Sequence, residues 1–143
     1  MSVTPDGNNA IISGRAYYAG WFTSWVDPRI ISINLNTKAI NWAKNMGPGC
    51  LNGYGHAVEV IDNSTAIISY YHYCGNQKAG VLEKVELNSY SVLYRKNVLL
   101  SNNNPLTAIV KIVKRPGSLG LGIIGKGNEF QLNADIIVGD KTF

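Results

Sequence analysis

The sequence predicts an all-β fold, and three observations lead to this prediction. Apolar residues make up 45% of the 143-residue chain and charged residues only 15%, against about 25% in an average soluble domain. Short runs rich in Val, Ile and Tyr alternate with clusters of Gly, Asn, Asp and Ser, as strands and turns do. No stretch carries the sustained apolar period of a long helix. These features exclude a disordered chain or a coiled coil and predict one domain over residues 1–143.

Two pairs of segments resemble each other. The stretch Asp6–Ser13 (DGNNAIIS) returns as Asp62–Ser69 (DNSTAIIS), and Ile33–Asn45 is echoed by Val85–Asn97. A third, truncated copy is expected to begin at Ala108. The offset is 56 residues in the first pair and 52 in the second, a difference that a longer loop in the first copy explains. Similarity of this kind predicts a repeat architecture. The expected repeats are approximately residues 1–50, 51–103 and 104–143.

Each repeat is expected to hold short strands separated by turns. In the second repeat the strands are expected near Ala57–Ile61, Thr65–Tyr73, Gly80–Leu87 and Ser91–Leu99. Four strands in about 50 residues, repeated along the chain, are typical of a β-propeller blade. The predicted fold is therefore all-β with propeller-like four-stranded antiparallel repeats, two complete and a third partial. A β-sandwich or barrel is the alternative, because those folds are also meanders of short strands.

The segment Asn34-Leu-Asn-Thr37, followed by Trp42, combines a turn with an aromatic residue in the next strand. This spacing resembles the tryptophan-docking blade motif of quinoprotein-like (PQQ-type) propellers. That motif has an Asp, then a Thr-Gly pair three residues later, and a Trp that closes the next strand. Asn34 stands for the Asp, Thr37 for the Thr and Trp42 for the Trp. The resemblance implies a blade in which this tryptophan packs between neighbouring sheets.

The second repeat keeps the same places with other residues. Glu86, Ser89 and Tyr94 occupy the positions of the Asp, Thr and Trp, and Tyr94 is expected to pack as the tryptophan does. Lys38 and Tyr90 replace the glycine of the motif in the two repeats. The resemblance therefore supports blade geometry better than it supports a cofactor.

Cysteine and histidine residues are the first candidates for chemistry. Cys50, His56, His72 and Cys74 have the atom types of a zinc site, but their spacing matches no common zinc finger. Two reduced cysteines are the favoured interpretation, and a disulfide is the alternative in an exported chain. A triad of Cys74, His56 and Asp62 can be drawn, yet nothing in the sequence brings these residues together. We therefore expect no catalytic residues, no metal and no cofactor.

Aromatic residues gather in two corresponding stretches, one in each of the first two repeats. Amphipathic rings clustered on one edge suit a sugar-binding or protein-binding face, because they bring large contact area at low entropic cost. The alternative is that some of these rings pack between sheets. The predicted ligand-binding residues are Tyr17, Tyr18, Trp21, Trp25, Tyr71 and Tyr73.

The formal net charge of +4 comes from the residues 78–143. The lysines and arginines there are diluted among apolar residues and glycines, without the stacking aromatics of a nucleic-acid surface. A nucleic-acid partner is therefore not expected. No run approaches the roughly 20 apolar residues that a membrane helix needs, so no membrane partner is expected either. No segment of the sequence indicates a cellular compartment.

A chain with two blades and part of a third would leave a sheet face without a partner, because propellers close with about four to eight blades. Exposed apolar patches usually mark association, and a two-fold dimer is the commonest closed assembly. The sequence therefore predicts a homodimer. The apolar residues expected on the free face are Ile109, Val110, Ile123, Ile136 and Val138.

The leading functional interpretation is a non-catalytic binding or assembly module with an aromatic loop face for a protein or carbohydrate ligand. The alternative is a fragment of a quinoprotein-like propeller enzyme. The resemblance implies that such an enzyme would need the whole ring, calcium and pyrroloquinoline quinone.

Overall fold

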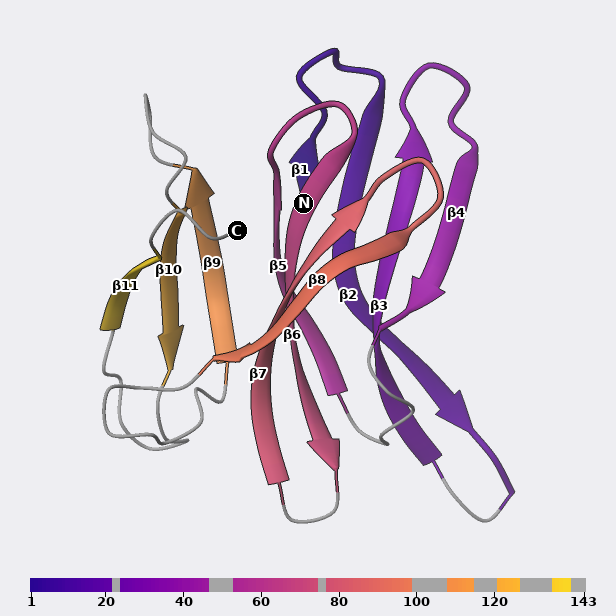
Figure 1. Cartoon of the computed structure of the whole chain (residues 1–143). Helices are drawn as coiled ribbons and strands as arrows, with labels where there is room; N and C mark the ends of the chain where they lie inside the picture. Colours follow the sequence, from indigo (N-terminus) through magenta and orange to yellow (C-terminus); the bar gives the residue numbers. More distant parts are fainter. Residues whose placement is uncertain are drawn as a thin grey trace.

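A computed structural model describes the greater part of the chain, and the described residues form three antiparallel sheets without a helix (Figure 1). The all-β prediction is confirmed. The barrel alternative is wrong, since each sheet of the described residues has two free edges and does not close on itself. The described residues are 1–21, 24–46, 53–74, 77–98, 108–114, 121–126 and 135–139.

The first two sheets are four-stranded meanders in which each strand pairs with the one that follows it. The first sheet contains β1 (Ser2–Val3), β2 (Asn9–Ala19), β3 (Ser24–Asn34) and β4 (Ile40–Asn45). The second sheet contains β5 (Gly53–Val60), β6 (Thr65–Cys74), β7 (Gln77–Glu86) and β8 (Ser91–Val98). The strands of the second sheet coincide with the four predicted strands apart from their ends.

The third sheet has three strands in the order β11-β10-β9. These strands are β9 (Ala108–Lys114), β10 (Leu121–Lys126) and β11 (Asp135–Gly139). The apolar side chains predicted on a free face of this sheet lie outside the described part of the structure, so that prediction stays open. They belong to Ile109, Val110, Ile123, Ile136 and Val138.

The three sheets follow one another in chain order, and each packs on the next (Figure 1). Strand β5 contacts β2 and β3, and β9 contacts β5 and β6. The main hydrophobic core lies between the first and second sheets. Its buried residues are Ile11, Ile30, Met46, Val58, Val60, Ala66, Ile68, Tyr70, Val81, Val85 and Leu87.

Four tight turns lie at one end of the first two sheets (Figure 1). The side chain of Asp62 shapes one of them, because its carboxylate accepts bonds from the backbone and hydroxyl groups of Ser64 and Thr65. Burial raises the pKa of Asp62, but these hydrogen bonds outweigh burial and lower the pKa to about 2. Asp6 makes an equivalent turn with Thr4 and Asn8. Both acids therefore organise turns, as residues with short polar side chains often do.

The turns after β3 and β7 share an unusual backbone conformation. Lys38 has φ 62° and Tyr90 has φ 53°, both in the left-handed region that favours glycine. These are the positions at which the blade motif has its glycine. The departure from glycine thus leaves the turn geometry in place and adds a side chain to each turn.

Strand β5 approaches the first sheet unusually closely at two glycines. A Cβ atom on Gly55 would lie 2.5 Å from the carbonyl oxygen of Gly14 and 2.5 Å from Oγ of Ser13. A Cβ atom on Gly53 would lie 2.7 Å from Cδ of Pro28. The strand predicted near Ala57–Ile61 therefore begins earlier in the structure and includes both glycines, since only glycine permits this contact between sheets.

Substitution of Gly55 tests this contact. We expect Gly55→Ala to lower the free energy of unfolding by about 1–3 kcal/mol, the usual range for overpacking. Urea unfolding followed by circular dichroism measures the change. Gly14→Ala is the control, since a Cβ atom there meets nothing within 4 Å. Equal stability of the two variants would contradict the close approach of the sheets.

Candidate functional site

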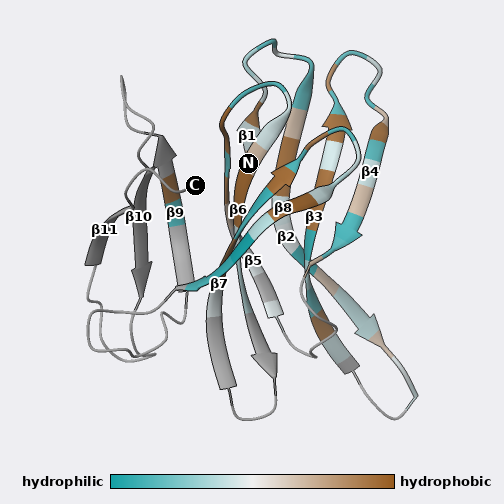
Figure 2. Cartoon of the chain, viewed as in Figure 1, coloured by the Kyte–Doolittle hydropathy of each residue, from teal (hydrophilic) through white to brown (hydrophobic). Residues whose placement is uncertain are grey.

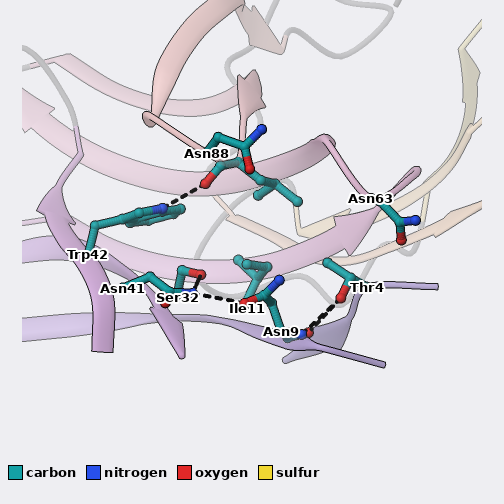
Figure 3. Close-up of a pocket in the computed structure, with 9 residues that line it drawn as sticks. Thr4, Asn9, Ile11, Ser32, Asn41, Trp42, Asn63 and Asn88 are labelled. Carbon is teal, nitrogen blue, oxygen red and sulfur yellow. Dashed lines mark hydrogen bonds between the residues drawn. The ribbon is translucent and has the colours of Figure 1, made fainter. Parts of the chain in front are cut away.

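A cavity of about 340 Å³ opens between the first and second sheets, at the end where the tight turns lie (Figure 3). None of its lining residues carries a charge, and four of them are asparagines. The lining residues are Thr4, Asn9, Ile11, Ser32, Asn41, Trp42, Asn63, Leu87 and Asn88.

The first sheet supplies one wall through alternate residues and a β-bulge. Ile11 pairs with Ser32 across β2 and β3, so both side chains point to the face that meets the second sheet. On β4, Trp42 pairs with Ser32, whereas Ile40 pairs with Ile33, so the pairing shifts between these positions. The bulge leaves Asn41 as an extra residue, and both it and Trp42 line the cavity.

Hydrogen bonds hold the asparagines of this wall in one orientation. Nδ2 of Asn41 donates to Oδ1 of Asn9 at 2.8 Å and to Oγ of Ser32 at 3.1 Å. Oδ1 of Asn41 and Nδ2 of Asn9 then have no partner among the described residues. One acceptor and one donor group are therefore available to a ligand.

Two turns of the second sheet supply the opposite wall (Figure 3). Oδ1 of Asn63 accepts a bond of 3.0 Å from the backbone N–H of Asp6, which leaves its Nδ2 as a donor. The backbone N–H of Asn88 donates to Glu86 at 3.0 Å, and its side-chain amide has no partner among the described residues. The second wall thus adds hydrogen-bond donors from Asn63 and Asn88 and an acceptor from Asn88.

Trp42 joins the two walls. Its Nε1 donates to the carbonyl oxygen of Leu87 at 2.6 Å, and its ring lies 5.3 Å from the ring of Tyr90 at an angle of 53°. The prediction that Trp42 packs between neighbouring sheets is confirmed. The same expectation for Tyr94 is wrong, because Tyr94 is 43% exposed on the edge strand β8.

Two of these lining positions hold other kinds of side chain in the second sheet. Lys84 pairs with Tyr94 as Ser32 pairs with Trp42, and Leu93 lies where Asn41 does. Strand pairing therefore does not require a hydroxyl or an amide at these positions. Ser32 and Asn41 therefore contribute to the lining of the cavity and are not needed for the strand pairing that the first two sheets share.

The predicted aromatic residues of the first repeat lie at the opposite end of the first sheet. Trp21 is 99% exposed and Tyr17 is 66% exposed. The rings of Tyr18 and Trp25 stack with centroids 5.6 Å apart, and Asn45 donates a bond of 2.8 Å to the hydroxyl of Tyr18. The structure thus brings Tyr18 and Trp25 together as a half-buried pair.

The predicted aromatic residues of the second repeat do not join this pair. Tyr70 points into the core shared with the first sheet, so Tyr71, the next residue of β6, points to the other face. The side chain of Tyr73 lies outside the described part of the structure. The six predicted residues are therefore not shown to form one aromatic face.

The cysteine and histidine candidates fall mostly outside the described residues. Cys50 lies outside the described residues, and the side chains of His56, His72 and Cys74 are not described either. The zinc, disulfide and triad interpretations therefore stay predictions. Within the described ranges, no group of three or more His, Cys, Asp or Glu residues could hold a metal ion.

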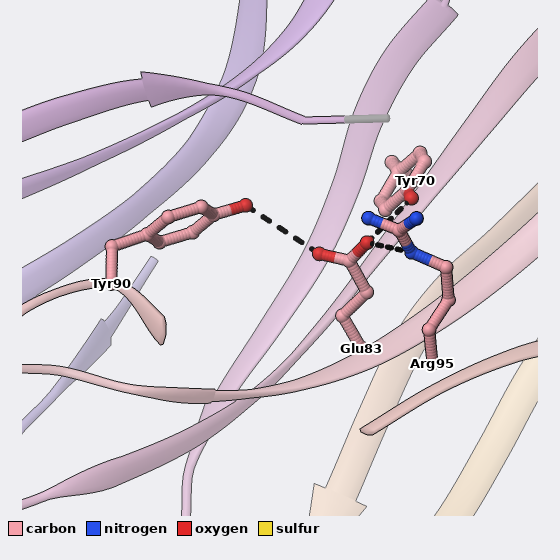
Figure 4. Close-up of polar contacts among 4 residues, drawn as sticks. All are labelled: Tyr70, Glu83, Tyr90 and Arg95. Atoms are coloured by element: carbon pink, nitrogen blue, oxygen red, sulfur yellow. Dashed lines mark hydrogen bonds and ion pairs between the residues drawn. The ribbon is translucent and has the colours of Figure 1, made fainter. Parts of the chain in front are cut away.

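A buried carboxylate forms a second polar cluster, which the sequence analysis missed (Figure 4). Glu83 is fully buried, accepts a bond of 2.7 Å from the hydroxyl of Tyr70 and pairs with Nε of Arg95. Burial and the neighbouring carboxylate both raise the pKa of Tyr70. The alternation Val81, Glu83, Val85 could have indicated a buried acid. Because Glu83 is fully buried and its bonds are made within the chain, we assign this cluster to the fold and not to a ligand site.

The fold and the cavity define a class: an all-β protein of successive antiparallel sheets with a neutral, amide-lined pocket between two of them. The described residues contain no helix that is long and apolar enough to cross a membrane. Comparison of the chain with protein-family models, with curated proteins and with solved structures finds no match.

Proposed function

We propose that this chain is a non-catalytic binding module that takes a neutral, hydroxyl-rich ligand, a small carbohydrate, in the pocket between its first two sheets. The observation that carries the proposal is the lining: four asparagines, two hydroxyl residues and a tryptophan, with no charged side chain. Amides both donate and accept hydrogen bonds, as sugar hydroxyls do, so the two sets of groups are complementary.

The size of the pocket supports a small ligand. Its volume of about 340 Å³ lies near the lower end of the range of about 300–1,000 Å³ for small-molecule pockets. The half-buried ring of Trp42 provides an apolar surface beside the amides, and Ile11 and Leu87 provide another. A sugar ring has an apolar C–H face and hydroxyl groups around its edge, so it fits such a mixture of surfaces.

The alternative of a quinoprotein-like enzyme fragment has less support. Calcium sites are built from oxygen ligands that include carboxylates, and no carboxylate lines this pocket. The turn acids Asp6 and Asp62 use their carboxylates for bonds within their own turns. The donor set of the pocket therefore does not fit calcium, and we derive no reaction from it.

We also propose that the sheets are propeller-like blades and that two chains associate. The blade arrangement is supported by the chain-order packing of the sheets and by the bond from Trp42 to the neighbouring sheet. Association is supported by apolar residues on the face of the first sheet that points away from the second sheet. The half-buried pair of Tyr18 and Trp25 lies on that face.

Calorimetric titration with a panel of neutral mono- and disaccharides tests the ligand class. For a sugar that binds, we expect Asn88→Ala to raise Kd about fivefold, because one hydrogen bond contributes roughly 1 kcal/mol and 1.4 kcal/mol corresponds to a factor of ten. Asn41→Leu places in the pocket the residue found at the corresponding position of the second sheet. We expect it to abolish binding.

Asn97→Ala is the control for these variants, because Asn97 is an exposed asparagine of β8 outside the pocket. Its Kd should equal that of the unsubstituted protein. A panel in which no sugar binds would refute the ligand class. An equal loss with Asn97→Ala would show that binding occurs elsewhere.

A further inference from the structure

The first sheet has two faces, and only one of them meets the second sheet. Ile11 and Ile30 are fully buried against the second sheet. Because successive side chains of a strand point to opposite faces, their neighbours point to the other side, which we call the outer face. Val3 and Ile40 on this face are 44% and 62% exposed. Apolar residues of the outer face are Val3, Ala10, Ile12, Ile31, Ile33 and Ile40.

The second sheet shows what such a face does inside this chain. Ile68 corresponds to Ile12 in the repeated segments, and Val85 corresponds to Ile33. Ile68 and Val85 are both fully buried, because the first sheet covers them. The outer face of the first sheet therefore corresponds to the face of the second sheet that the first sheet covers. We expect the outer face to be covered by a similar sheet. Figure 2 shows the apolar bands on β2 and β3.

Two opposite charges lie next to each other on the outer face. Asp27 and Arg29 are both on β3, on either side of the buried Pro28. Nε of Arg29 is buried and has no hydrogen-bond partner, and no ion pair of Arg29 occurs within the described ranges. Oδ2 of Asp27 accepts a long hydrogen bond of 3.4 Å from Nδ2 of Asn45. Asp27 and Arg29 thus carry opposite charges on the outer face, and no ion pair within the described ranges neutralises either of them.

We propose that the outer face of the first sheet is the interface between two copies of this chain. The copies are related by a two-fold axis that lies between the two stacked sheets, passes over Pro28 and runs perpendicular to β3. This axis places Arg29 of one copy opposite Asp27 of the partner subunit, and the reverse. Stacked sheets lie about 10 Å apart, a gap that an arginine and an aspartate span together. An axis parallel to the strand would instead set like charges opposite each other, which costs association energy.

The same axis gives the aromatic pair a partner. Trp25 of one copy then lies over Ile31 of the other, so the half-buried rings of Tyr18 and Trp25 cover apolar side chains. Such an interface is isologous, since both copies use one surface. The inference rests on the self-association in the proposed function and specifies its surface. It is independent of the sugar pocket, which lies on the other face of this sheet.

Sedimentation velocity at micromolar concentration tests the interface through a charge swap. We expect the unsubstituted protein to sediment at twice the chain mass of 15.6 kDa. Arg29→Asp alone and Asp27→Arg alone should each raise the dimer Kd at least tenfold, because each sets like charges opposite one another. The double variant restores both pairs and should return Kd to within about threefold of the original value.

A second pair of variants avoids the strand interior. Ile40→Lys changes an exposed residue of the outer face and should also weaken the dimer at least tenfold. Val92→Lys is its control, because Val92 has the corresponding position on β8 and is 41% exposed outside the proposed interface. Circular dichroism confirms that each variant is folded.

The outcomes separate the proposals. A monomer at high concentration would overturn both this interface and self-association, without affecting the sugar titration. A dimer that neither the single charge reversals nor Ile40→Lys weaken would overturn the interface alone. A dimer weakened by single reversals but not restored by the double variant would overturn the two-fold axis at Pro28.

Discussion

Trp42→Ala is expected to lower the free energy of unfolding by about 3 kcal/mol, the lower end of the range for removing a large aromatic side chain from a core. The substitution removes the bond of Nε1 to the carbonyl oxygen of Leu87 and the contact with Tyr90. Both contacts join the first sheet to the second. A small domain is stable by only about 5–15 kcal/mol, so a loss of this size is readily measured by urea unfolding.

Tyr94→Ala is the matched control for this prediction. Tyr94 pairs with Lys84 at the position where Trp42 pairs with Ser32, but it is 43% exposed. We expect it to cost less than half as much as Trp42→Ala, because removal of a partly exposed ring leaves no buried cavity. If the two variants lost equal stability, the contact of Trp42 with Leu87 would not be what joins the sheets.

Arg95→Ala is expected to destabilise the protein by a similar amount, about 3 kcal/mol, since it leaves a buried carboxylate without its cationic partner. Glu83 is fully buried, whereas the side chain of Arg95 is 44% exposed. The lost energy thus comes mainly from the unpaired charge and only in small part from packing. Thermal or urea unfolding of the single variant measures it.

The first sheet itself suggests the control for this pair. Ile31 pairs with Ala43 at the positions where Glu83 pairs with Arg95. The double variant Glu83→Ile with Arg95→Ala copies that apolar pair and should recover at least half of the lost stability, because no buried charge remains. A double variant less stable than Arg95→Ala would show that the acid contributes more than the pairing of its charge.

Some features could be predicted from the sequence because they depend on residues close together in the chain. Asp6 and Asp62 shape turns through bonds to residues two or three positions away, and the strands after them follow from β-branched residues. The place of Trp42 could be predicted as well, since its spacing from the turn at Asn34 resembles a known motif. The start of β5 at Gly53 could not be predicted, because glycine in a loop and glycine in a close strand contact look alike in sequence.

The sequence by itself therefore determined an all-β chain, the order of the strands in the second sheet and the position of one tryptophan between sheets. Only the tertiary structure decided the pocket, because Asn9 and Asn41 meet Asn63 and Asn88 across two sheets, far apart in the chain. Burial of Glu83 likewise depends on which sheet covers its strand. Local sequence patterns determine the alternation of side chains along a strand and the positions of turns. A cavity or a buried charge exists only once segments distant in the chain have packed together.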